Sequence, residues 1–129
     1  MAKIQPVNTP HAPKAIGPYS QAVKAGNLAF LSGQIPLQPD TMEIVDGGIE
    51  AQANQVFKNL SAVIEATGAT LADVVKLTIY LTDLSEFPRV NDIMASYFEE
   101  PYPARATVEV SALPKGALVE VDAVVALGD

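Results

Sequence analysis

The chain has 129 residues, a formal net charge of −7, one histidine and no cysteine. This length suits a single domain spanning residues 1–129. The lack of cysteine excludes disulfide frameworks, thiolate nucleophiles and Cys-ligated zinc, and one histidine excludes a His-rich metal site within one chain. The acidic balance argues against a nucleic-acid partner, because such binding depends on Lys and Arg side chains that neutralise phosphates.

Composition and hydropathy predict a cytoplasmic protein that buries part of its surface in an oligomer. No segment reaches the ~18 apolar residues of a membrane span, and the N-terminus lacks the apolar run of a signal peptide. Charged residues make up 18% of the chain and hydrophobic residues 49%. Because the charged share is below the ~25% typical of soluble domains, we expect a homo-oligomer, and we expect no membrane partner.

The first part of the chain predicts an arm followed by a hairpin. Residues 6–18 are rich in Pro, Ala and Gly, which favours an extended segment. Two β-type runs, 19–25 and 28–32, flank Gly26-Asn27, a pair typical of a tight hairpin turn. Residues 42–45 suggest one further short strand.

A helix is predicted over residues 49–67, where apolar side chains recur at helical spacing and Gly68 follows as a stop signal. Residues 74–81 alternate between apolar and polar side chains, which predicts a strand with one buried face. The side chains expected on that face are Val75, Leu77, Ile79 and Leu81.

A second helix follows, with Asp83 or Ser85 as its cap and with Pro101 preventing its continuation. Two last strands, 104–110 and 118–127, complete the order β-β-β-α-β-α-β-β. The fold class is therefore α+β, with two helices that cover only one face of a six-stranded sheet. The other face must meet solvent or another subunit.

Arg105 and Glu120 are the most informative polar residues, since each lies on one of the last two strands. A planar guanidinium suits bidentate capture of a carboxylate. A nearby glutamate suits holding that arginine, or orienting a water molecule beside an electrophile. The strand pattern alone favours a simpler interpretation, a solvated face with a surface ion pair. It does not show whether the two strands pair.

Four further residues also have two interpretations. Tyr19 heads the first β-type run, Ser32 and Gly33 end the second where glycine allows a ligand near the main chain, and Asn91 lies on the polar side of the second helix. An interface tyrosine, a turn and a surface residue are the simpler alternatives. His11 lies in the arm, which leaves a Ser-His-Asp triad without a base.

Segments in order along almost the whole chain resemble the RidA family, also called the YjgF/YER057c/UK114 family. The resemblance implies a chorismate-mutase-like fold, related to the ferredoxin-like fold, and a homotrimer whose sheets form a central barrel with clefts between subunits. The matching segments are 16–22, 32–36, 90–91, 103–110, 113–115 and 119–121.

The resemblance also implies an activity: hydrolysis of 2-iminopropanoate and 2-iminobutanoate to 2-keto acids and ammonia, without metal or organic cofactor. It assigns the substrate carboxylate to Arg105 and the attacking water to Glu120. Thr107 stands where many bacterial members have cysteine, which excludes thiol chemistry and leaves the backbone carbonyl to help hold water. The pocket residues implied besides Arg105 are Tyr19, contributed across the interface, Ser32, Gly33, Asn91 and Thr107.

Two rival functions stay open at this point. An endoribonuclease or translation inhibitor is an activity ascribed to some eukaryotic relatives, and the acidity and single histidine of this chain argue against it. A non-catalytic ligand-binding or chaperone-like trimer would use the same cleft as a carboxylate sensor.

Overall fold

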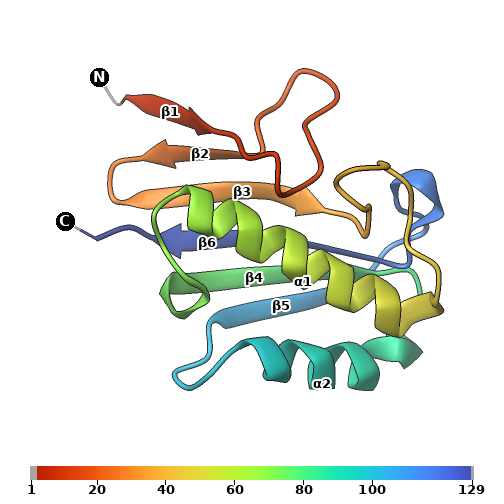
Figure 1. Ribbon diagram of the computed structural model, residues 1–129. Coiled ribbons are helices and arrows are strands. Elements are labelled where there is room, and N and C mark those ends of the chain that lie inside the picture. Colours follow the sequence, from red (N-terminus) through yellow and green to blue (C-terminus); the bar gives the residue numbers. More distant parts are fainter. Residues whose placement is uncertain (1–2, 129) are drawn as a thin grey trace.

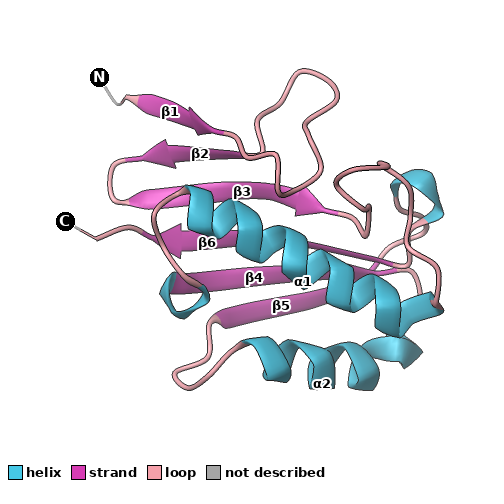
Figure 2. Cartoon of the chain, viewed as in Figure 1, coloured by secondary structure: helices cyan, strands magenta, loops and turns pink. Residues whose placement is uncertain are grey.

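A computed structural model describes residues 3–128, which form one six-stranded mixed sheet with both helices on the same side of it (Figure 1). The strands are β1 (Ile4–Val7), β2 (Ala22–Ala25), β3 (Leu28–Gln34), β4 (Val74–Leu81), β5 (Ala104–Glu109) and β6 (Val119–Ala126). The helices are α1 (Gly48–Ala66) and α2 (Phe87–Tyr97). The predicted α+β architecture is confirmed (Figure 2).

The order of strands across the sheet is β1-β2-β3-β6-β4-β5. Neighbouring strands are antiparallel except β4 and β5, which run parallel. β4 therefore lies between β5 and β6, and these two strands do not pair with each other. The sequence alone did not show whether these two strands pair. Their separation by β4 decides where Arg105 and Glu120 lie.

The core fills the space between α1 and the covered face of the sheet. Phe57 of α1 is fully buried, and its ring stacks on Tyr97 at 5.4 Å and meets Phe98 edge-on at 6.1 Å between centroids. Aromatic pairs at these distances contribute roughly 0.5–1.5 kcal/mol beyond the burial of their area. This cluster fixes the end of α2 against α1. Buried side chains from the sheet include Leu77, Ile79, Leu81, Val119, Val121 and Val125.

The other face of the sheet is left uncovered by the described part of the chain, and large apolar side chains lie on it. Phe30 of β3 is 45% exposed and Val108 of β5 is 40% exposed. Large apolar side chains exposed on a sheet face that no helix covers are typical of a surface that meets a partner. The expected uncovered face is thus present.

The predicted hairpin is confirmed, with Ala25 paired to Leu28 and Gly26 at a φ of +63° in the turn. The strand predicted over 42–45 is wrong: this region makes only an isolated bridge between Leu37 and Ile44. An edge strand that was not predicted, β1, begins before the arm and includes its first two residues, Pro6 and Val7. The observed order of elements matches the predicted order only because β1, which was not predicted, takes the place of the strand predicted over 42–45.

Within β4, Val75 is not on the buried face. The register against β6 shifts between Val74 and Lys76, so that Val74 is buried and Val75 is 44% exposed. Leu77, Ile79 and Leu81 keep the predicted face.

Asp83 does act as a cap, because its Oδ1 accepts a hydrogen bond from the backbone N–H of Ser85 at 2.9 Å. The turn that it caps is a short 3₁₀ segment, Leu84–Glu86, directly before α2. Among the described helices, none combines the length and apolar character needed to cross a membrane.

Candidate active site

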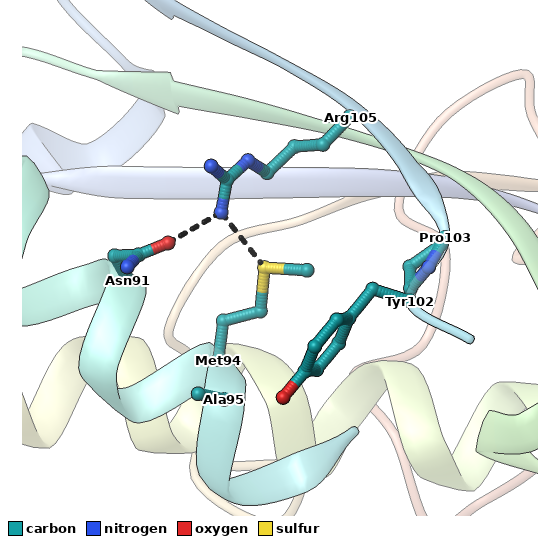
Figure 3. Close-up of a pocket in the computed structure, with 6 residues that line it drawn as sticks. All are labelled: Asn91, Met94, Ala95, Tyr102, Pro103 and Arg105. Atoms are coloured by element: carbon teal, nitrogen blue, oxygen red, sulfur yellow. Dashed lines mark hydrogen bonds between the residues drawn. The ribbon is translucent and has the colours of Figure 1, made fainter. Parts of the chain in front are cut away.

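Arg105 lies opposite Leu77 in the parallel pair of β5 with β4, so its side chain leaves the sheet on the helix-covered side. There its guanidinium meets α2 (Figure 3). Nη1 donates a hydrogen bond to Asn91 Oδ1 at 2.5 Å and lies 3.4 Å from the sulfur of Met94. The guanidinium carbon lies 4.9 Å from the ring centroid of Phe87, within the range of a cation–π contact.

These contacts orient the guanidinium without neutralising it. Within residues 3–128, its recorded partners are an amide oxygen, a thioether and an aromatic ring, and none is a carboxylate. The donors on Nε and Nη2 of Arg105 have no recorded partner there. A guanidinium held on one side by neutral groups suits bidentate binding of an anion on the other.

A cavity of about 390 Å³ opens beside this guanidinium. The volume is within the range of small-molecule sites, about 300–1,000 Å³. Six residues line it, from α2, from β5 and from the segment before β5: Asn91, Met94, Ala95, Tyr102, Pro103 and Arg105 (Figure 3).

Glu120 lies on the opposite side of the sheet. It pairs with Tyr80 of β4, and its neighbours along β6, Val119 and Val121, point into the core. Because side chains alternate along a strand, Glu120 projects from the uncovered face, with β4 between its strand and that of Arg105. The hypothesis that Glu120 holds Arg105 is therefore wrong within one chain, and so is the surface ion pair between them.

A close approach to the backbone of β3 makes room for the Glu120 carboxylate. A Cβ built on Gly33 would overlap the Oε2 of Glu120 and lie 2.9 Å from its Cδ. Gly33 sits where the register of β3 against β6 shifts, between Leu31 and Gln34. Only a residue without a side chain allows the carboxylate to lie here.

Burial raises the pKa of Glu120 above the ordinary value of a glutamate, and the charge of Asp122 raises this pKa further. Asp122 is itself held by Tyr80, whose hydroxyl donates to its Oδ2 at 2.9 Å. That hydrogen bond to Asp122 is the main cause of a raised pKa for Tyr80. A carboxylate with a raised pKa is a better proton acceptor near neutral pH.

Tyr19, Ser32 and Gly33 lie together at the end of β3. Ser32 Oγ donates to the backbone oxygen of Ser20 at 2.6 Å, which joins β3 to the segment that carries Tyr19. Tyr19 is 55% exposed and lines, with Gly33, a second cavity of about 380 Å³. Since Gly33 also contacts Glu120, these residues belong with Glu120 and not with Arg105; we call Glu120, Gly33, Ser32 and Tyr19 the Glu120 group.

Thr107 lies two residues after Arg105 on the same side of β5, opposite Ile79. Its hydroxyl is buried and has no hydrogen-bond partner in the described part of the chain. A buried hydroxyl without a partner costs about 1–3 kcal/mol, which a bound water or ligand would recover. We call Arg105, Asn91 and Thr107 the Arg105 group.

The structure adds residues that the sequence did not single out. Phe87 and Met94 lie on α2, and both contact Arg105. Their positions relative to Asn91 carried a usable signal, because residues three and four apart share one helix face. The sequence analysis also omitted Gln21. Its buried side-chain amide forms hydrogen bonds with the backbone of Thr9 and Pro13 and so fixes the loop that leads to Tyr19.

A family model described as endoribonuclease L-PSP matches residues 9–127 of this chain. The chain belongs to the RidA family. It is 49% identical over 121 residues to a 2-iminobutanoate/2-iminopropanoate deaminase of Dermatophagoides farinae, covering 94% of both sequences. The family resemblance seen in the sequence is thus confirmed.

Solved structures of RidA proteins share the fold. RidA of the Antarctic bacterium Psychrobacter sp. PAMC 21119 superimposes with a TM-score of 0.92 at 50% identity, covering 95% of this chain and 99% of that one. E. coli TdcF, solved with bound serine, gives a TM-score of 0.91 at 37% identity, covering 96% of this chain and 99% of that one. The arrangement of six strands and two helices is therefore that of the RidA fold.

Proposed function

We propose that this protein hydrolyses 2-imino acids, such as 2-iminopropanoate and 2-iminobutanoate, to 2-keto acids and ammonia. The observation that carries the proposal is the Arg105 guanidinium, which α2 orients beside a cavity and which keeps donors without a partner among residues 3–128. A deaminase of this specificity among the relatives supports it. So does the serine bound in TdcF, which has the carboxylate that an imino acid also has.

We propose further that the active site is completed between copies of the chain in a homotrimer. Within one chain, the Arg105 group and the Glu120 group lie on opposite sides of the sheet, so they cannot act on one small substrate. A second copy that binds the uncovered face would cover Phe30 and Val108 and bring its Arg105 group to the Glu120 group. Symmetric homo-oligomers are the common way to bury such a face.

In the proposed reaction, Arg105 binds the substrate carboxylate and the protonated imine carbon is the electrophile. Water attacks this carbon while Glu120 accepts its proton, and the C=N electron pair moves to nitrogen. Glu120 returns the proton to nitrogen and the C–N bond breaks, releasing ammonia as the C=O bond forms. The hydroxyl proton passes to the freed Glu120 carboxylate and from there to solvent. The raised pKa of Glu120 suits both halves of this proton transfer, and the reaction needs no metal or organic cofactor.

Arg105→Ala tests the proposal. Losing two charge-assisted hydrogen bonds to the substrate is expected to cost about 3 kcal/mol, or roughly 100-fold in kcat/KM. The imine is generated in place by a serine or threonine dehydratase, and release of the 2-keto acid is followed. Arg105→Lys keeps the charge but loses the planar fork, so it should recover only part of the rate.

Arg89→Ala is the matched control, because Arg89 is an exposed arginine of α2 that does not line the cavity. It should leave the rate unchanged. The proposal would be overturned if Arg105→Ala accelerated release of the 2-keto acid as much as the unmodified protein does.

The family description as an endoribonuclease provides the alternative function. The net charge of −7 argues against a phosphate backbone as substrate. Degradation of labelled RNA by highly purified protein, lost in Arg105→Ala, would favour that alternative.

A further inference from the structure

We propose that Tyr80 and Asp122 are positioning residues for Glu120. Asp122 accepts the hydroxyl of Tyr80 and so leaves the Glu120 carboxylate free to hold the attacking water. The proposal rests on the imine hydrolysis proposed above and adds two residues to that reaction.

The pairing of β4 with β6 brings the three side chains together on the uncovered face of the sheet. Ile79 and Leu81 are fully buried in the core, so Tyr80 between them projects from the other face. Tyr80 lies directly opposite Glu120, and Asp122 lies two residues further along β6. Both the directly opposite and the diagonal neighbour across a sheet are within reach of an aromatic side chain. The hydroxyl of Tyr80 therefore has two carboxylates to choose between.

The hydroxyl of Tyr80 is given to Asp122. It donates to Asp122 Oδ2 at 2.9 Å, and this hydrogen bond is the main cause of the raised pKa of Tyr80. The charges of Asp122 and Glu120 raise that pKa further, so the hydroxyl lies within the electrostatic reach of both carboxylates. Because a tyrosine hydroxyl has one proton to donate, the bond to Asp122 excludes one of equal strength to Glu120.

Glu120 keeps its carboxylate oxygens for other partners. No donor to them is recorded in the part of the chain that the structure describes, and the pKa of Glu120 is raised by burial and then by the charge of Asp122. A hydrogen bond to an ionised carboxyl group lowers its affinity for a proton. A hydroxyl donated by Tyr80 would therefore make Glu120 a weaker base and occupy a lone pair that the attacking water needs.

Other titratable groups lie on the same face, in the loops around the cavity at Gly33 and, in the proposed trimer, on a second copy of the chain. They stay the same in every variant below, so differences between variants report on the Tyr80–Asp122 pair alone. These groups are Lys76 of β4, Lys14, Tyr19 and Lys115 of the loops, and Arg105 of the second copy.

Asp122→Val tests the proposal. Valine suits a strand and accepts no hydrogen bond, so the hydroxyl of Tyr80 should turn to Glu120. Because a hydrogen bond to a charged group is worth a factor of about ten or more, kcat at saturating imine should fall about tenfold. The acidic limb of the pH–rate profile should move to lower pH. The imine is generated in place by the dehydratase, and release of the 2-keto acid is followed.

Tyr80→Phe separates the hydroxyl from the charge of Asp122. Added to Asp122→Val, it removes the hydroxyl, so kcat should rise about fivefold. The acidic limb should return only part of the way, since the charge of Asp122 is still absent. With Asp122 in place, Tyr80→Phe should not raise kcat, because the hydroxyl is already held away from Glu120. Tyr97→Phe is the control: it removes a hydroxyl that bonds Asn54 between α1 and α2, and it should leave kcat and the limb unchanged.

A titration that does not depend on activity follows Glu120 directly. The glutamate side-chain carboxyls are labelled with carbon-13, and the Glu120 resonance is the one missing from Glu120→Gln. This resonance should titrate at lower pH in Asp122→Val than in the unmodified protein, and between the two in the double variant. The same spectra show whether each variant is folded. Asp122→Ala removes the same acceptor and should behave as Asp122→Val, which guards against a folding defect caused by valine.

The outcomes separate this inference from the proposed function. If the unmodified protein hydrolyses no imine, the proposed function falls, and the titration alone decides whether Asp122 keeps the hydroxyl from Glu120. If the imine is hydrolysed, but Tyr80→Phe has the same effect with and without Asp122, only this inference is refuted. A rise in kcat on adding Tyr80→Phe that occurs only when Asp122 is absent supports it.

Discussion

Replacing Gly33 with alanine tests how the structure positions Glu120. The added methyl carbon would lie 2.9 Å from Cδ and 3.1 Å from Cγ of Glu120. Ordinary contacts between carbon atoms lie at roughly 3.5–4.0 Å, so the carboxylate must move by about 1 Å. The backbone at Gly33 cannot absorb this shift easily, because β3 is paired to β6 on either side of it, at Leu31 and at Gln34.

Such a shift should cost activity and spare stability. A displacement of about 1 Å in an active site lowers a rate by roughly 100-fold. An off-rotamer Glu120 side chain costs about 0.5–1.5 kcal/mol, while alanine in a strand is more favourable than glycine by roughly 0.5–1 kcal/mol. Because these terms nearly cancel, we expect Tm to change by no more than about 4 °C.

The assay measures kcat at saturating imine from release of the 2-keto acid, and Tm by calorimetry. Gly128→Ala is the control, since a Cβ built on Gly128 meets nothing within 4 Å; it should match the unmodified protein in both measurements. A Gly33→Ala protein with normal kcat would show that this close approach does not place the catalytic carboxylate.

Three further predictions concern neighbours of the site. Asp122→Asn removes a negative charge that raises the pKa of Glu120. This pKa should therefore fall, and the acidic limb of the pH–rate profile should move to lower pH. An acidic limb at the same pH as in the unmodified protein would contradict an effect of Asp122 on the pKa of Glu120. Thr107→Val removes a buried hydroxyl that has no partner among residues 3–128 and should raise the free energy of unfolding by about 1 kcal/mol; a lower free energy of unfolding in urea would mean that the hydroxyl has a hydrogen-bond partner in the native assembly. Gln21→Leu breaks the buried amide contacts to Thr9 and Pro13 and should cost about 1–3 kcal/mol, with faster hydrogen exchange in the loop; unchanged exchange would remove its role as a clamp.

Periodicity predicted the elements whose burial is regular. α1 was predicted at 49–67 and observed at Gly48–Ala66, and β4 was predicted at its observed bounds. Both elements pack regularly spaced apolar side chains against the core, and this spacing can be recognised in the sequence. α2 and β6 were located for the same reason, whereas β5 was located although its side chains are mostly exposed within one chain.

The edge of the sheet was harder to predict. β1 contains Pro6 and pairs only with β2, and proline is tolerated in a strand at such an edge. Proline in a short run signals an irregular arm as readily as a strand. Val75 was misplaced because the register shift beside it inverts the alternation on which the prediction relied.

The chemistry of the site depended on pairing that no local pattern contains. Arg105 and Glu120 lie on strands adjacent in sequence, yet β4 is inserted between them in space. The order of strands across the sheet depends on contacts between distant parts of the sequence, and the alternation of side chains along one strand does not determine it. The family resemblance supplied the roles of both residues, and those roles, like the cytoplasmic location and the trimer, stay predictions for this chain.

The insertion of β4 between the two halves of the site has a genetic consequence. In the proposed trimer, one chain brings Arg105 to a cleft and its neighbour brings Glu120. Two inactive proteins, one Arg105→Ala and the other Glu120→Ala, would then complement each other when unfolded and refolded together. Random assembly leaves about a quarter of the clefts with both residues intact, so two defective alleles would together restore a measurable part of the activity that neither supplies alone.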